Sequence, residues 1–140
     1  MTSKKNLYWL IAGIINLFTA LLHTIGGQIE LVSPLQKSDL TNQAKAEWFG
    51  VWHMVTIILF ASSFLVLKNA IVEYQKRQIE LMKYIGILYI LLSIPSCISS
   101  VVHKLLAPQW ILLLPIGILI YFGTNSKNKK NEPHNQKLNE

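Results

Sequence analysis

Four long stretches of apolar residues alternate with polar segments along the chain. They cover about residues 7–32, 48–67, 84–106 and 108–123. A helix needs about 20 apolar residues to cross the ~30 Å hydrocarbon core of a bilayer, and the two middle stretches have that length. The last stretch is short for a span, but tilt or local thinning of the bilayer accommodates such a helix. The pattern predicts an all-α bundle of four transmembrane helices.

Composition supports this prediction. Of the 140 residues, 51% are hydrophobic and 14% are charged, whereas ordinary soluble domains contain about 25% charged residues. The first stretch follows Lys4 and Lys5 as in a signal peptide, but it is longer than the apolar region of a signal peptide, so we interpret it as an uncleaved span. We predict one membrane domain, residues 1–126, and a disordered basic tail, residues 127–140.

Positive charges predict the orientation of the bundle. Ten Lys and Arg residues fall in the two terminal segments and the 68–83 connection, and three, Lys37, Lys45 and Lys104, fall in the other two connections. Cytoplasmic loops are enriched in Lys and Arg, so both termini are predicted to be cytoplasmic. The net charge of +6 therefore reflects topology. The basic tail is expected to contact lipid headgroups and not nucleic acid. The four-span pattern is similar to that of small bacterial membrane proteins, and frequent Ile, Lys and Asn suit an AT-rich genome, so we expect a bacterial cytoplasmic membrane.

Aromatic residues occur where the spans are predicted to meet the two membrane interfaces, as in an aromatic belt. The outer set is Trp48, Trp52 and Trp110, and the inner set is Tyr8 and Trp9. In the first outer connection, Ser33-Pro34 predicts the end of a helix, because the residue before a proline disfavours helical geometry. The following segment, residues 39–47, is expected to form a short interfacial helix.

Stripes of small and polar residues run along the first three spans at steps of three or four residues, which is the spacing of one helix face. Their members are Asn16, Thr19, His23, Gly26 and Glu30; then Gly50, His53, Thr56, Phe60 and Ser63; and then Gly86, Tyr89, Ser93, Ser96, Ser100 and His103. Small and hydroxyl residues in such stripes ordinarily let membrane helices approach and hydrogen-bond. The fourth span carries no ionisable residue and is expected to complete the wall of the bundle.

Three histidines stand near the same, outer ends of their spans. A histidine within a bilayer is rare and costly, so His23, His53 and His103 form the candidate site. The residues expected to line the site with them are Asn16, Glu30, Trp52 and Ser100.

The depth of His23 depends on how the first helix ends. The three depths agree if that helix stops or bends at Gly26-Gly27, and Glu30 then folds toward the histidines. If the helix is straight to Val32, His23 lies about a turn deeper, and one site containing all three histidines is strained.

Several chemistries fit this candidate site. Three imidazoles with Glu30 or Glu47 suit a transition metal such as Zn²⁺, Cu²⁺ or Fe²⁺. Two histidines on facing helices suit b-type haem, with Gly26-Gly27 leaving room for the ring edge and Trp52 packing nearby. A metal-free site suits a small lipid-like or quinone-like molecule, with imidazole and carboxylate exchanging protons.

A non-catalytic role is the alternative. In that reading the polar stripes pack against a partner membrane protein, or against further copies of the chain. The sequence contains neither a local metal motif such as HExxH nor a glycine-rich phosphate loop, so nucleotides are not indicated. We favour the ligand- or metal-binding site over the accessory subunit. Catalytic residues stay unassigned.

Overall fold

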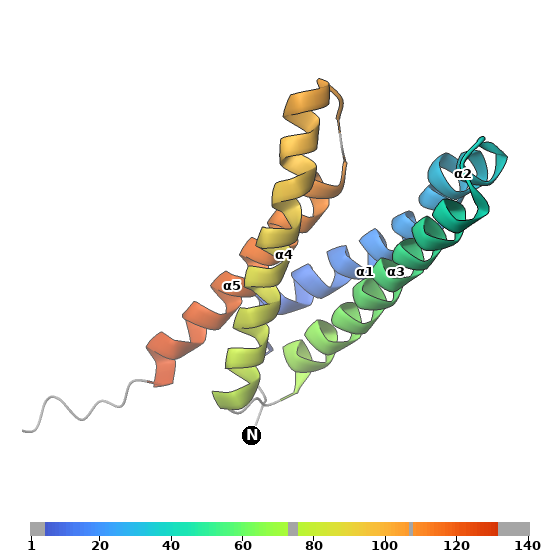
Figure 1. Cartoon of the computed structure of the whole chain (residues 1–140). Helices are drawn as coiled ribbons and strands as arrows, with labels where there is room; N and C mark the ends of the chain where they lie inside the picture. The colour runs from blue at the N-terminus through green and yellow to red at the C-terminus, as the bar shows by residue number, and fades with distance from the viewer. Residues whose placement is uncertain (1–4, 73–75, 107, 132–140) are drawn as a thin grey trace, which may run out of the picture.

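The computed structural model describes residues 5–72, 76–106 and 108–131, and its regular structure within these ranges is helical (Figure 1). The first helix, α1 (Leu7–Gly27), continues through a π-helical turn, η1 (Gln28–Val32), into α2 (Ser33–Lys37). The remaining helices are α3 (Asn42–Ile71), α4 (Lys76–His103) and α5 (Gln109–Asn131).

Three helical segments are long and apolar enough to cross a membrane. They are Leu7–Lys37, Asn42–Ile71 and Gln78–His103, and α5 adds a shorter apolar segment, Gln109–Asn125. Large apolar side chains cover the outside of the helices, and Ile57, Phe64 and Leu91 are each more than half exposed. Such a surface suits contact with lipid. The prediction of an all-α bundle of four transmembrane helices is confirmed.

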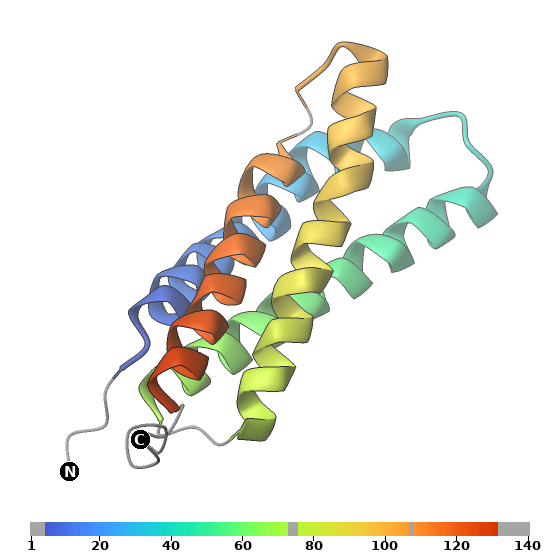
Figure 2. The same ribbon diagram turned by 90° about the vertical axis from the view of Figure 1, so that its left-hand side faces the viewer.

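The helices form two antiparallel hairpins. The first hairpin contains α1, η1, α2 and α3, and the second contains α4 and α5. Contact between the hairpins runs mainly from α1 to α5, while α3 barely contacts α4. The hairpins are close together where α1 begins and α3 ends, which we call the narrow end, and they diverge toward the wide end, where α2 and the α4–α5 connection lie (Figures 1 and 2).

Hydrogen bonds join three helices at the narrow end. The Asn6 backbone N–H donates to the Ala70 carbonyl (2.9 Å), and its side-chain amide donates to the Gly123 carbonyl (3.0 Å). The indole N–H of Trp9 donates to the Ile120 carbonyl (3.0 Å). Trp9 is fully buried, so its prediction as a member of the inner aromatic belt was wrong. Its ring occupies the space left by Gly123, where a Cβ would lie 2.4 Å from the indole.

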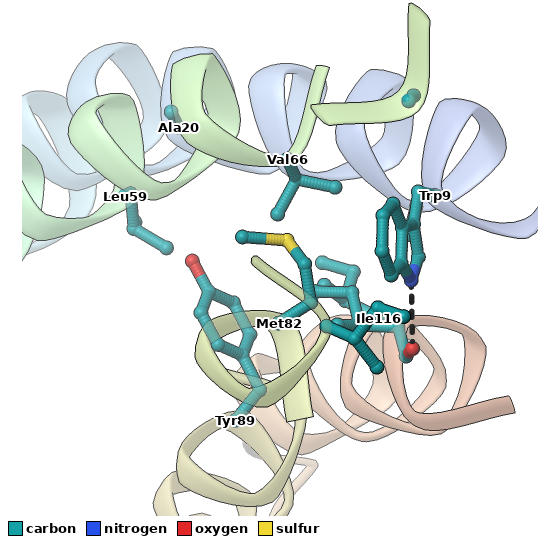
Figure 3. Close-up of a cluster of buried hydrophobic side chains, with 11 residues drawn as sticks. Trp9, Ala20, Leu59, Val66, Met82, Tyr89 and Ile116 are labelled. Carbon is teal, nitrogen blue, oxygen red and sulfur yellow. Dashed lines mark hydrogen bonds between the residues drawn. The ribbon is translucent and has the colours of Figure 1, made fainter. Parts of the chain in front are cut away.

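The apolar core lies between the narrow end and the middle of the bundle (Figure 3). Val66 of α3, Met82 of α4 and Ile116 of α5 are completely buried and meet there. Within the second hairpin, Gly86 and Gly117 allow the two backbones to approach closely. A Cβ on Gly117 would lie 2.8 Å from the Gly86 carbonyl oxygen, so this pair packs as small residues typically do between membrane helices.

The outer connection differs from its prediction. The α-helix α1 ends at Gly27, directly after the glycine pair, but the helical path does not stop there or at Ser33-Pro34; it continues through η1 and α2 to Lys37. Pro34 stands in the first turn of α2, directly after the π-helical turn, where a helix tolerates a residue without a backbone N–H. The segment 39–47 contains no separate interfacial helix, because its residues from Asn42 onward form the first turns of α3.

The start of α1, the end of α3 and Gly123 of α5 meet at the narrow end, as four antiparallel spans require. The assignment of this end to the cytoplasm stays a prediction. Helix α5 runs to Asn131, so the first residues of the predicted tail are helical, and residues 132–140 lie outside the described part of the chain.

Candidate functional site

A buried network of polar side chains connects the two hairpins in the middle of the bundle. The Asn16 amide of α1 donates to the Ser62 hydroxyl of α3 (3.0 Å), and the Tyr89 hydroxyl of α4 donates to Asn16 Oδ1 (2.9 Å). The Ser62 and Tyr89 oxygens are 2.5 Å apart. All three residues are buried. The predicted candidate Asn16 is thus a member of this buried network. Ser62 was missed because the sequence pattern favoured its neighbour Ser63.

Most of the other stripe residues also bond within the protein. The Ser93 hydroxyl donates to the Ile90 carbonyl (2.6 Å), and the Ser100 hydroxyl donates to the Ser96 carbonyl (2.9 Å). Ser100 in turn accepts a hydrogen bond from the indole N–H of Trp110 on α5 (3.1 Å). The predicted site residue Ser100 therefore joins α4 to α5. These hydroxyl groups therefore have hydrogen-bond partners within the protein.

His23 of α1 stacks on Trp52 of α3. The ring centroids are 3.7 Å apart and the planes differ by 11°. The imidazole Nε2 lies 3.5 Å from the Trp52 carbonyl oxygen, which also accepts a hydrogen bond from the Thr56 hydroxyl (3.0 Å). His23 is seven residues from Asn16, which is nearly two full turns, so both face the inside of the first hairpin. The polar stripe of the first span therefore meets α3.

Gly27 provides the space for the Trp52 indole. A Cβ on Gly27 would lie 1.7 Å from Cζ2 of that ring, whereas a Cβ on Gly26 would meet nothing within 4 Å. The room that the sequence suggested for a haem edge is thus filled by Trp52 itself. His23 and Trp52, two predicted site residues, are brought together, but as packed neighbours.

His53 lies on a different side of α3. It is exposed, and the Phe49 ring contacts it edge-on, with centroids 4.2 Å apart and planes at 80°. Nine residues, or two and a half helical turns, separate His53 from Ser62. Since Ser62 contacts Tyr89 of α4, His53 faces away from the second hairpin. No hydrogen bond joins its imidazole to another residue of the described ranges.

His103 and Glu30 are not gathered with the other candidates. His103 is the last residue of α4, at the wide end of the second hairpin, and it is exposed. Glu30 is exposed on η1. Across the described ranges, no three His, Cys, Asp or Glu side chains are grouped so as to hold a metal ion. The arrangement of the side chains thus gives the metal and haem alternatives no geometric support.

A small hollow opens between η1–α2 and the first turns of α3. Its volume is about 220 Å³, and it is lined by Val32, Leu35, Gln36, Lys45, Ala46 and Phe49. The Lys45 ammonium donates to the Gln36 carbonyl across it (3.0 Å). Phe49 borders both the hollow and His53, so the two features are neighbours. The hollow was not predictable from the sequence, because Lys45 was expected in a separate interfacial helix.

The sequence matches no protein-family model, and neither the curated proteins nor the solved structures contain a match to it. The fold itself defines the class: a small α-helical membrane protein built from two hairpins. Its functional assignment rests on the side chains described above.

Proposed function

We propose that the protein binds a small lipophilic molecule that carries a polar group, either lipid-like or quinone-like, at the wide end of the first hairpin. The observation that carries the proposal is the exposed imidazole of His53 within a membrane-spanning helix. A polar group in hydrocarbon is costly unless it is hydrogen-bonded. A bound molecule with a carbonyl or hydroxyl group would satisfy His53, which has no such partner among the described residues.

The neighbouring side chains suit the rest of such a molecule. Phe49 and Trp52 both precede His53 on α3 and provide aromatic surface beside it; Phe49 contacts the His53 imidazole and Trp52 contacts that of His23. His23 has a positioning role, because its ring holds the Trp52 indole from the side of α1. Glu30, exposed on η1, lies outside this proposed site, as do Asn16, Ser100 and His103.

Fluorescence of Trp52 provides the test. In a Trp48→Phe/Trp110→Phe background, the remaining tryptophans are Trp52, at the proposed site, and Trp9, which is fully buried at the narrow end and serves as an internal reference. The protein in detergent is titrated with a brominated phosphatidylcholine, as the lipid-like probe, and with a ubiquinone carrying a ten-carbon tail, as the quinone-like probe. Saturable quenching by either probe is the expected result.

His53→Ala is the test variant, and His103→Ala is its matched control, because both histidines are exposed near the wide end. Loss of one hydrogen bond to a ligand at a desolvated site weakens binding by about 5–10-fold. We expect this weakening of binding in His53→Ala but not in His103→Ala. Quenching that never saturates, or equal effects of the two substitutions, would refute the proposed site.

A further inference from the structure

We propose that the ligand of this site is an anionic phospholipid of the adjacent leaflet, with its headgroup held by Lys45 and an acyl chain entering the hollow beside Phe49. This inference rests on the proposed function, and it narrows the lipid-like and quinone-like alternatives to one class. Three features of the hollow carry it: its size, its charge and its orientation along α3.

The hollow is too small to enclose a drug-sized molecule. Pockets that enclose drug-sized molecules measure about 300–1,000 Å³, whereas this hollow measures about 220 Å³. Apolar side chains, among them Val32, Leu35 and Phe49, form most of its wall. A segment of a flexible hydrocarbon chain fits such a space, while the remainder of the molecule extends along the helices into the bilayer.

The charge of the hollow favours an anion. Lys45 is half-buried at its edge, and its ammonium donates to a carbonyl oxygen, that of Gln36. It makes no ion pair with any other residue in the described part of the chain. The nearest acid in sequence, Glu47, accepts instead from the Gln43 amide (2.7 Å). An ammonium beside apolar groups without a carboxylate is a favourable position for a lipid phosphate.

The order of Lys45, Phe49 and His53 along α3 matches the orientation of a lipid in a bilayer. Along α3, Phe49 lies about 6 Å deeper than Lys45, and His53 lies about 12 Å deeper, from the rise of a helix. A lipid whose phosphate pairs with Lys45 at the interface would therefore place its glycerol esters near the depth of Phe49 and extend its acyl chains toward His53.

The experiment measures lipid preference at Trp52 in nanodiscs, with the Trp48→Phe/Trp110→Phe background. One series contains brominated phosphatidylglycerol diluted in plain phosphatidylcholine, and the other contains brominated phosphatidylcholine in plain phosphatidylglycerol. One cation near a membrane surface favours an anionic lipid by about fivefold. We expect a preference of that size for phosphatidylglycerol, and we expect it to weaken as salt is raised.

Lys45→Gln is expected to reduce the preference to about one. Lys104→Gln is the matched control, a lysine of the other outer connection, and is expected to leave the preference unchanged. The headgroup inference would be overturned by an equal preference for phosphatidylglycerol in the wild type and Lys45→Gln, or by saturable binding of the quinone alone. Either result would leave the proposed binding site intact. Absence of saturable quenching by all probes would instead overturn the proposed function.

Discussion

Tyr89 of α4 donates a hydrogen bond of 2.9 Å to the Asn16 side chain of α1, in the middle of the bundle. This bond crosses from one hairpin to the other at a point where both side chains are buried. Ser62 completes the contact, with its hydroxyl 2.5 Å from that of Tyr89. Since α3 and α4 touch little elsewhere, this network is their main specific connection.

Removing the Tyr89 hydroxyl tests that connection. Hydrogen bonds between membrane helices are worth about 0.6 kcal/mol on average and up to about 1.7. Tyr89→Phe removes two contacts at once and leaves Asn16 Oδ1 buried without its donor, so we expect a loss of about 1–2 kcal/mol in the free energy of unfolding. Titration of the purified protein with sodium dodecyl sulfate measures it.

Tyr84→Phe is the control for this substitution. Tyr84 lies on the same helix but is 70% exposed, so its hydroxyl contributes little to the fold. We expect its free energy of unfolding to stay within about 0.5 kcal/mol of the wild type. Equal losses in the two variants would show that the network contributes nothing specific.

A methyl group on Gly27 should displace the Trp52 indole. The added Cβ would lie 1.7 Å from Cζ2, so the ring must leave its place against His23. Overpacking of this kind costs about 1–3 kcal/mol. We expect Gly27→Ala to destabilise the protein by that amount and to shift the emission of Trp52.

Gly26→Ala is the natural comparison, because its Cβ would meet nothing within 4 Å. It adds a good helix former to a helix, and we expect stability to be equal or to rise by up to about 1 kcal/mol. A similar loss in both glycine variants would mean that the indole does not occupy the space beside Gly27.

The second hairpin offers a parallel prediction. In Gly117→Ala, the new Cβ would lie 2.8 Å from the Gly86 carbonyl oxygen and 2.9 Å from the Ile90 backbone nitrogen. Backbone atoms cannot rotate away, so α4 and α5 must separate, at a cost of about 1–3 kcal/mol. Gly50→Ala, whose Cβ would meet nothing within 4 Å, should be neutral when both variants are unfolded by titration with sodium dodecyl sulfate. Insensitivity of the protein to both changes would contradict the close approach.

Cysteine labelling tests the orientation. In a Cys97→Ser background, Lys45→Cys and Lys104→Cys should react with an impermeant maleimide in intact cells. Lys68→Cys and Lys83→Cys should react only after permeabilisation, because the charge distribution assigns them to the cytoplasm. Labelling of Lys104→Cys solely in permeabilised cells would reverse the assignment.

The number and class of the helices were predictable from the sequence, because the length of an apolar stretch is set by the thickness of the bilayer. The extension of the first helix to Lys37 was not predictable from the sequence. Ser33-Pro34 is a stop signal in isolation, yet a proline is also well tolerated in a first turn, and the π-helical turn before Ser33 creates such a start.

The prediction that the three histidines converge on one site was weaker than the prediction of the helices. Helical spacing shows which residues share a face, but not which neighbouring helix that face meets. The stripe of Asn16 and His23 does point inward, as the spacing predicts. The stripe containing His53 does not turn toward α4, because Ser62, on the opposite face, makes that contact. Helical spacing thus predicted the face that Asn16 and His23 share, but not the separate positions of His53 and His103.

The division into two hairpins has a consequence for how the molecule is made. Each hairpin has its own internal contacts, α1 with α3 and α4 with α5, and these outnumber the contacts across the divide. Two helical pairs of this kind can enter the bilayer one after the other during synthesis and dock afterwards through Asn16, Ser62 and Tyr89. A chain interrupted between α3 and α4 would then still assemble from its two halves.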